Sequence, residues 1–371
     1  MSDPPAGASD PAAGVTLFVG TRKGLFRASS DRDRHRWTLE GPHLAGYEVY
    51  HAVADPRHPG SVYAAVNHMV WGSHLYRSLD GGSSWEPSPG RLAFPASTGR
   101  RVRALWHVAP GHADHPDRLY VGTDPAALFV SDDGGERWRW LPGLEEHPSR
   151  PSWQSARGGL FLHSIQPDPG EPSRLYVAVS AGGCYRSEDA GESWRPINRG
   201  IRAEHLPDPE APAGHNPHAL RLHPGHRSRL YLQGYDGVYR SDDGGDGWTE
   251  ITDGLPSGFG YAVALDASDP DRCWVVPEEG SHMRCVCEAR LRVYESGDGG
   301  GSWAARSEGL PQEHAYLSVL RDALCTDGLE PCGVYLGTST GHLFGSRDGV
   351  GWTLLAGFLP TILSVTAVGS R

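Results

Sequence analysis

The stretch SDDGGDGW (241–248) identifies the repeating unit of this sequence. Related stretches are SLDGGSSW (78–85), SDDGGERW (131–138), SEDAGESW (187–194), SGDGGGSW (296–303) and the shorter SRDGVGW (346–352). The Asp residues at the equivalent position follow one another at intervals of about 50 to 56 residues, a period typical of propellers and other repeat arrays. The fold therefore has to accommodate one such turn per repeat.

One repeat contains four short strands. It consists of HALRLHP (218–224), SRLYLQG (228–234), GVYRSDDGGDGW (237–248) and TEITDGL (249–255), and the turn joins the third strand to the fourth. Asp and Ser side chains can bond to nearby backbone N–H groups, and Gly tolerates positive φ, so the turn is predicted to be structural. A four-stranded unit repeated around an axis predicts an all-β propeller.

The two ends of the chain predict the number of blades. Residues 15–40 hold three strands and lack an inner strand, whereas ILSVTAV (362–368) is an inner-type strand with nothing after it. Pairing these segments would give seven blades, with the first closed by the C-terminal strand, and would remove an exposed sheet edge. We expect a flexible tail over 1–14 and a single propeller over 15–371.

Composition restricts the classes of partner. The formal net charge is −11, and Lys and Arg are not clustered, which argues against nucleic acid as a partner.

The N-terminal stretch lacks a secretory pattern, and no apolar segment is long enough to span a membrane, so a cytoplasmic protein is expected. A small-molecule substrate is expected. A closed propeller has no free edge, so we expect a monomer or weak dimer.

The repeated S-x-D-x-G-x-x-W turns, with segments such as LYVGT and GVYRS before them, resemble the Asp-box or BNR repeats of sialidase-like and sortilin-like propellers. The resemblance covers almost the whole chain and implies the fold rather than one activity. The Arg-Ile-Pro motif of sialidases is absent from the sequence. A sialidase-like glycoside hydrolase and a non-catalytic protein-binding scaffold therefore remain alternatives.

Four consecutive inner strands are predicted to begin with histidine, at His51, His107, His163 and His218, and the equivalent inner strand of the seventh blade is predicted at LSVLRDA (317–323). Near-radial symmetry would bring them to one height, where imidazoles could hold a divalent transition metal, Fe first and then Zn, Cu or Mn. This pattern predicts a non-haem iron oxygenase or a Lewis-acid enzyme for a small anionic or polar substrate. The alternative is a structural ring in which each histidine bonds to the backbone of a neighbouring blade.

Further site residues follow from their places in the repeat. Glu48 precedes the first histidine and is a candidate hydrogen-bond acceptor for an imidazole, and Tyr261 takes the histidine position in the next blade, so both are predicted to be catalytic. Substrate contacts are expected from loops at the same end of the blades and from the long entry 142–161: Arg22, Lys23, His68, Asp124, Trp153, Arg157, Tyr235 and Glu278. Ordinary solvated loops are the alternative for each.

Overall fold

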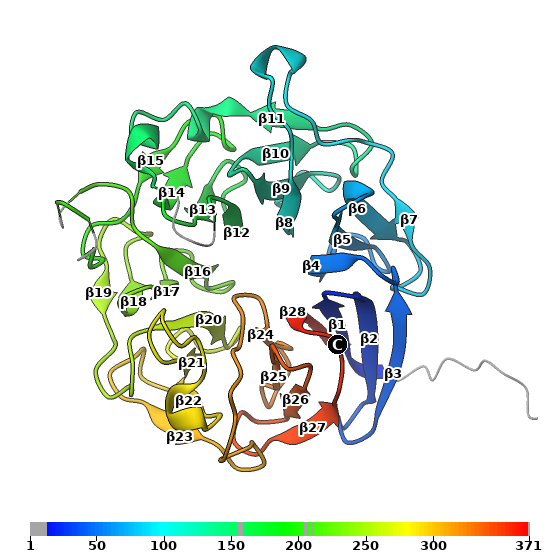
Figure 1. The fold of residues 1–371 in the computed structure, drawn as a ribbon, viewed down its shortest axis with the longest axis vertical. Helices are drawn as coiled ribbons and strands as arrows, with labels where there is room; N and C mark the ends of the chain where they lie inside the picture. The colour runs from blue at the N-terminus through cyan, green and yellow to red at the C-terminus, as the bar shows by residue number, and fades with distance from the viewer. Residues whose placement is uncertain (1–12, 155–158, 204–205, 209–210, 370–371) are drawn as a thin grey trace, which may run out of the picture.

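The computed structural model describes residues 13–154, 159–203, 206–208 and 211–369. These residues form seven four-stranded antiparallel sheets arranged radially around a central axis (Figure 1). The predicted all-β, seven-bladed propeller is confirmed. The predicted tail 1–14 falls almost entirely outside the described residues, and Ala13 and Gly14 already belong to the first strand.

The strands are given blade by blade from the first to the seventh, beginning at the axis. The innermost strands are β28 (Ile362–Gly369), β4 (Glu48–Ala54), β8 (Ala104–Pro110), β12 (Leu162–Pro167), β16 (Pro217–Leu222), β20 (Gly260–Leu265) and β24 (Leu324–Thr326). The second strands are β1 (Ala13–Thr21), β5 (Val62–His68), β9 (Leu119–Asp124), β13 (Leu175–Val179), β17 (Leu230–Gly234), β21 (Cys273–Pro277) and β25 (Val334–Gly337).

The third strands are β2 (Gly24–Asp31), β6 (Gly72–Ser78), β10 (Leu128–Ser131), β14 (Gly183–Ser187), β18 (Val238–Ser241), β22 (Val293–Ser296) and β26 (Leu343–Ser346). The outermost are β3 (Trp37–His43), β7 (Glu86–Pro87), β11 (Arg139–Leu141), β15 (Arg195–Pro196), β19 (Thr249–Glu250), β23 (Ala304–Arg306) and β27 (Thr353–Ala356). Single 3-10 turns lie at Ala96–Thr98, Pro142–Leu144, Arg150–Ser152 and Cys287–Ala289. No helix in the described ranges has the length and apolarity needed to cross a bilayer.

The C-terminal strand closes the ring. β28 pairs antiparallel with β1 from Val15 opposite Gly369 to Thr21 opposite Ile362. The first blade is thus built from both ends of the chain, as the two incomplete end segments predicted. Opening the ring would expose the hydrogen-bonding edge of β1.

The repeated turn has the structural role predicted for it. In the fourth blade, for example, the Ser187 hydroxyl donates to Asp189 Oδ1 (2.8 Å), and Ser187 Oγ accepts a hydrogen bond from the Gly191 N–H (2.8 Å). Asp189 Oδ1 also accepts the Ser193 N–H (2.8 Å), and the Trp194 indole N–H donates to the Gly191 carbonyl (3.0 Å). These bonds join residues at most four apart, so the motif stabilises its own turn wherever it occurs.

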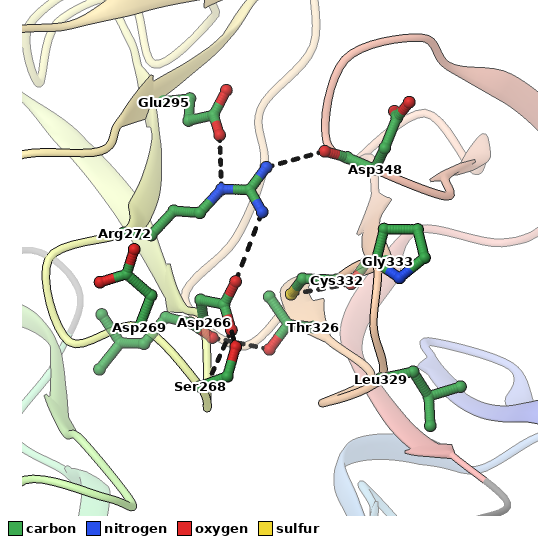
Figure 2. Close-up of polar contacts among 12 residues, drawn as sticks. Asp266, Ser268, Asp269, Arg272, Glu295, Thr326, Leu329, Cys332, Gly333 and Asp348 are labelled. Carbon is green, nitrogen blue, oxygen red and sulfur yellow. Dashed lines mark hydrogen bonds and ion pairs between the residues drawn. The ribbon is translucent and has the colours of Figure 1, made fainter.

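Arginines connect one blade to the turn of the next. Figure 2 shows Arg272 of the sixth blade, which donates to Glu295 Oε1 (2.6 Å) in its own blade and to the Asp348 carbonyl (2.8 Å) in the seventh. Arg186 and Arg240 make the same contact with the following blades, at the carbonyls of Gly244 and Gly299 (both 2.7 Å). Buried aliphatic and aromatic side chains fill the space between the sheets.

The seventh blade departs from the predicted frame. The stretch LSVLRDA (317–323) was aligned with the histidine strands, but the innermost strand of this blade begins only at Leu324. The carboxylate of Glu278 accepts hydrogen bonds from the Ser318 hydroxyl (2.7 Å) and the Val319 N–H (2.9 Å). These bonds satisfy groups that a regular strand would have paired, so residues 317–323 run as an irregular segment that places Arg321 and Asp322 near the axis.

Candidate functional site

A cavity of about 350 Å³ occupies the axis at the end where the inner strands begin. We call it the upper cavity. Its lining comes from inner strands, from loops between second and third strands and from the irregular segment of the seventh blade: Arg22, Tyr50, Trp106, Phe161, Ser180, Asn216, Pro217, His218, Tyr235, Phe259, Tyr261, Ser281, Arg284, Leu320, Arg321, Asp322 and Leu363. Closure of the ring brings these residues together.

Aromatic rings form much of the wall of the upper cavity. The Trp106 and Phe161 rings stack with centroids 3.7 Å apart and an interplanar angle of 4°, and Tyr50 packs against Trp106 at 4.7 Å. On the opposite side Phe259 lies edge-on to Tyr261 at 5.3 Å. Such a wall offers flat apolar faces with phenolic hydroxyls at their edges, which suits a ligand with apolar faces and hydroxyl groups.

Asp322 supplies a carboxylate to the upper cavity. Its Oδ1 accepts a hydrogen bond from Arg221 Nη2 (2.8 Å), and its Oδ2 lies 3.7 Å from His107 Nδ1, beyond hydrogen-bond distance. Burial alone would raise the pKa of Asp322, but the adjacent His107 and the Arg221 guanidinium hold that pKa well below its usual range. The carboxylate is therefore ionised at neutral pH.

A second cavity of about 390 Å³ lies on the other side of Asp322 along the axis. It contacts His51, His107 and Arg221, and Asp322 belongs to the lining of both cavities. The His51 and His107 rings stack at 4.0 Å. Burial, together with the neighbouring His107, lowers the pKa of His51 to about 3, so its imidazole is neutral.

The four predicted histidine ligands do not converge on one point. His163 Nε2 bonds the Pro217 carbonyl (3.1 Å), and His218 Nδ1 bonds the Gly260 carbonyl (2.6 Å), in each case in the following blade. His51 Nδ1 accepts a long hydrogen bond from the Val108 N–H (3.5 Å), also in the following blade. The alternative of a structural ring describes these three histidines, because twist and strand parity turn their nitrogens toward neighbouring backbone.

Among the described residues, one group offers several metal-ligand atoms close together. Atoms of His51, His107 and Asp322 lie within 4.8 Å of one another. Nitrogen and oxygen ligands at about 2.1 Å from a tetrahedral zinc lie about 3.4 Å apart, and His107 Nδ1 lies 3.7 Å from Asp322 Oδ2. The carboxylate of Asp322 is already paired with Arg221. A divalent cation would have to compete with Arg221 for this carboxylate, and the divalent transition metal stays a prediction.

Of the predicted catalytic and rim residues, the structure brings Arg22, Tyr235 and Tyr261 into the upper cavity. Glu48 lies beside the cavity and pairs with Arg22 Nη1 (2.6 Å) rather than with an imidazole, which corrects its predicted role. Tyr235 donates its hydroxyl to Ser281 Oγ (2.7 Å).

The other predicted substrate contacts lie outside the lining of the upper cavity, within the described part of the chain. Trp153 is buried in the blade core and donates its indole N–H to the Tyr185 hydroxyl (2.7 Å), so its role is structural. Asp124 pairs with Arg103, and His68 Nδ1 caps its own hairpin through the Val70 N–H (3.0 Å). Lys23 is exposed, Glu278 is fully buried behind the cavity wall, and Arg157 lies outside the described residues.

Sequence reasoning missed Asp322 and most of the aromatic wall. The adjacent charged residues Arg321 and Asp322 were a weak signal, because equivalent segments of other repeats also carry charged residues, at Asp55, Arg221 and Asp266. Tyr50 and Trp106 stand one position before His51 and His107 within β4 and β8, and Phe161 stands two positions before His163, just ahead of β12. Nothing in the repeat indicates that they share a wall.

Comparison with known proteins finds xyloglucanases among the proteins similar to this chain. No protein-family model matches the chain. An oligoxyloglucan-reducing end-specific xyloglucanase of Emericella nidulans is 25% identical over 317 residues, which cover 76% of this chain and 37% of that enzyme. Xyloglucanase Xgh74A of Acetivibrio thermocellus is 25% identical over 276 residues, 65% of this chain and 32% of that enzyme. The chain therefore spans about a third of the length of these relatives.

The fold is also shared with a solved structure. An ancestral GH74 enzyme aligns with 80% of this chain and 36% of its own, with a TM-score of 0.59 and 18% sequence identity. At this identity the likeness shows the propeller fold alone. Because no family model matches, the Asp-box family assignment stays a prediction, as do the cytoplasmic location and the monomer or weak dimer.

The predicted metal-dependent enzyme, whether oxygenase or Lewis-acid enzyme, is wrong. The curated relatives are xyloglucanases, and the four histidines do not form the ligand set on which that prediction depended. These findings favour the glycoside hydrolase that the sequence left as an alternative.

Proposed function

We propose that the chain binds a saccharide in the upper cavity and hydrolyses a glycosidic bond there. The observation that carries the proposal is the cavity itself, whose lining combines six aromatic side chains with the ionised carboxylate of Asp322. The similarity to xyloglucanases supports it, although the chain covers only part of those enzymes.

The aromatic wall supplies binding. The C–H faces of a pyranose ring pack on aromatic faces, and its hydroxyls need polar partners around the edge. Trp106 and Phe161 offer stacked faces, and the Tyr50 and Tyr261 hydroxyls, Ser180 and Asn216 offer polar groups in the same cavity. Burial raises the pKa of Tyr50 to about 12, so its hydroxyl remains a neutral hydrogen-bond donor.

Asp322 supplies the base. Hydrolysis of a glycoside uses a carboxylate near the anomeric carbon and a proton donor at the leaving oxygen. Asp322 is ionised and lines the cavity, and Tyr261 presents a hydroxyl whose pKa burial raises, so it stays protonated. In this scheme Asp322 takes a proton from a water molecule that attacks the anomeric carbon, and the bond from that carbon to the leaving oxygen breaks. The leaving oxygen takes the proton of the Tyr261 hydroxyl, and proton exchange with solvent restores both side chains.

Glu278 affects the site through the segment to which it is hydrogen-bonded. Burial raises its pKa to about 7, but its side chain is fully buried and bonds to Ser318 and Val319. These bonds hold the segment that carries Asp322, so we assign Glu278 a positioning role.

The test is oligosaccharide hydrolysis by the purified full chain. Xyloglucan oligosaccharides and other β-1,4-linked glucans are incubated with the wild type, and released reducing ends are quantified by mass spectrometry. Asp322→Asn should lower turnover by about a hundredfold or more while substrate still binds, because it removes the charge that acts on the reacting carbon. The matched control is Asp114→Asn, an exposed aspartate on a distant turn, which should hydrolyse normally.

Two results would overturn the proposal. One is an Asp322→Asn variant that turns over substrate at the wild-type rate, since the proposed carboxylate would then be unnecessary. The other is a wild type that neither binds nor cleaves any saccharide of the panel at millimolar concentration.

A further inference from the structure

Arg321 is a cation that lacks an anionic partner among the described residues. Its guanidinium carbon lies 5.1 Å from the Phe161 ring centre and 5.2 Å from the Tyr261 ring centre. Its Nε is buried and has no hydrogen-bond acceptor within the described ranges. Aromatic faces attract a cation more weakly than a bidentate carboxylate does, so the charge is only partly compensated.

The neighbours of Arg321 do not neutralise it. Tyr261 remains uncharged because burial raises its pKa, and burial and Arg321 itself lower the pKa of His218 to about 3. The adjacent Asp322 directs Oδ1 to Arg221 Nη2 at 2.8 Å, and its Oδ2 faces His107. Its negative charge is thus shared with a second arginine on the other side of the axis.

The charges that line the upper cavity sum to an excess of cations. The charged lining residues are Arg22, Arg284, Arg321 and Asp322. Arg22 pairs with Glu48, and Asp322 pairs with Arg221, which leaves Arg284 and Arg321 without a carboxylate partner among the residues described. The chain as a whole carries a formal charge of −11, so the positive charge of this cavity is opposite in sign to the net charge of the protein. Low-dielectric walls strengthen its attraction for an anion.

We propose that the ligand of the upper cavity is an acidic saccharide, such as a hexuronic acid, whose carboxylate pairs with Arg321. The inference rests on the saccharide binding proposed above and names the class of sugar. Phe161 and Tyr261 lie beside the guanidinium, and Arg321 belongs to the cavity lining, so its terminal N–H groups are the donors that a ligand there would meet. A planar carboxylate matches the fork of two parallel N–H groups, and Arg284 adds positive charge at the rim.

The test compares two disaccharides that differ in one group. Cellobiouronic acid carries a carboxylate where cellobiose carries a hydroxymethyl, and binding of each to the full chain is measured by isothermal titration calorimetry. The wild type should bind the acid at least about tenfold more tightly, as expected for a charge-assisted bidentate pair, and the preference should shrink as salt is raised. Cellobiose 6′-phosphate, as a third ligand, separates a carboxylate site from a general oxyanion site.

Variants assign the preference to Arg321. Arg321→Gln should bind the acid and cellobiose with similar affinity, and a circular dichroism spectrum that matches the wild type shows that the variant is folded. Arg321→Lys retains the charge without the planar fork and should recover only part of the preference. The control is Arg103→Gln, which removes an exposed arginine that pairs with Asp124 outside the cavity lining.

Each outcome bears on the inference. Equal affinity of the wild type for the acid and the neutral sugar overturns it and leaves the proposed saccharide binding intact. A preference that survives in Arg321→Gln overturns the assignment to this residue, and tighter binding of the phosphate overturns the carboxylate. Failure of the wild type to bind any of the three ligands overturns both this inference and the proposed function.

Discussion

Acidification between about pH 6.5 and pH 5 should destabilise the fold through its buried histidines. The pKa values of His51 and His218 are lowered to about 3 by burial, against an ordinary value of 6.5. The unfolded chain therefore takes up protons in this range that the folded chain does not, and the free energy of unfolding falls with pH. Each histidine should cost about 2 kcal/mol of stability by about pH 5. Burial shifts the pKa of His163 in the same direction.

One buried group opposes this trend. The pKa of Glu278 is raised by burial to about 7, so the folded chain takes up a proton there at a pH where the unfolded chain does not. This stabilises the fold by about 2 kcal/mol at about pH 5. The net loss for the wild type is therefore about 2 kcal/mol from His51, His218 and Glu278 together, to which His163 adds. In Glu278→Gln the opposing contribution is absent, so the net loss should rise to the about 4 kcal/mol that the two histidines contribute together.

Urea unfolding followed by circular dichroism at about pH 7.5 and about pH 5 measures both quantities. The Glu278→Gln variant isolates the histidines, and adding His51→Asn and His218→Asn to it should remove about 4 kcal/mol of the acid loss. His115→Asn, which replaces an exposed histidine, is the control. Equal stability of Glu278→Gln at the two pH values would refute the reasoning, as would an acid loss that persists unchanged in the triple variant.

Three further perturbations follow from the contacts. Asp327→Ala should lower the free energy of unfolding, measured with urea, by about 3 to 5 kcal/mol, because the buried Arg34 loses its carboxylate partner (2.8 Å). This ion pair joins the first and last blades, and a decrease below about 1 kcal/mol would contradict the prediction. Arg240→Gln removes one contact between neighbouring blades and should lower the unfolding free energy by about 1 to 2 kcal/mol, with an unchanged value as the contrary result. Trp106→Ala should weaken cellobiose binding about tenfold in calorimetry by removing half of a stacked pair, whereas wild-type affinity would place the sugar elsewhere.

The blade count could be read from the sequence because its signals are local. The hydrogen bonds that Ser187 and Asp189 make within the turn connect residues at most four apart, so each copy of the motif predicts a hairpin at its own position. Pairing of the two ends also followed, since an inner-type strand at the C-terminus had one vacant partner at the N-terminus. The one strand placed wrongly, at 317–323, depended on Glu278, a residue in another blade that no local pattern could reveal.

The histidine prediction was wrong about the direction in which the imidazole nitrogens point. The four histidines do lie in equivalent inner strands, but they do not begin them: β4 and β8 start three residues before His51 and His107, and β12 and β16 start one residue before His163 and His218. Whether their nitrogens point to the axis or to the next blade depends on twist, and His163 and His218 turn to the carbonyls of Pro217 and Gly260. Arg22 and Tyr261 were placed correctly in the cavity because the ends of strands that share a face of the propeller must meet around its axis.

The sequence by itself determined the repeat, its four strands and the closure of seven blades, since hydrogen bonds within short turns and alternation along strands are properties of neighbouring residues. Only the tertiary structure decided the site. Trp106, Phe161, Tyr261 and Asp322 come from different blades, and they face one cavity because the ring closes and each blade twists by a set amount. The charge left on Arg321 has the same origin, because the direction of every nearby carboxylate is a consequence of packing between blades.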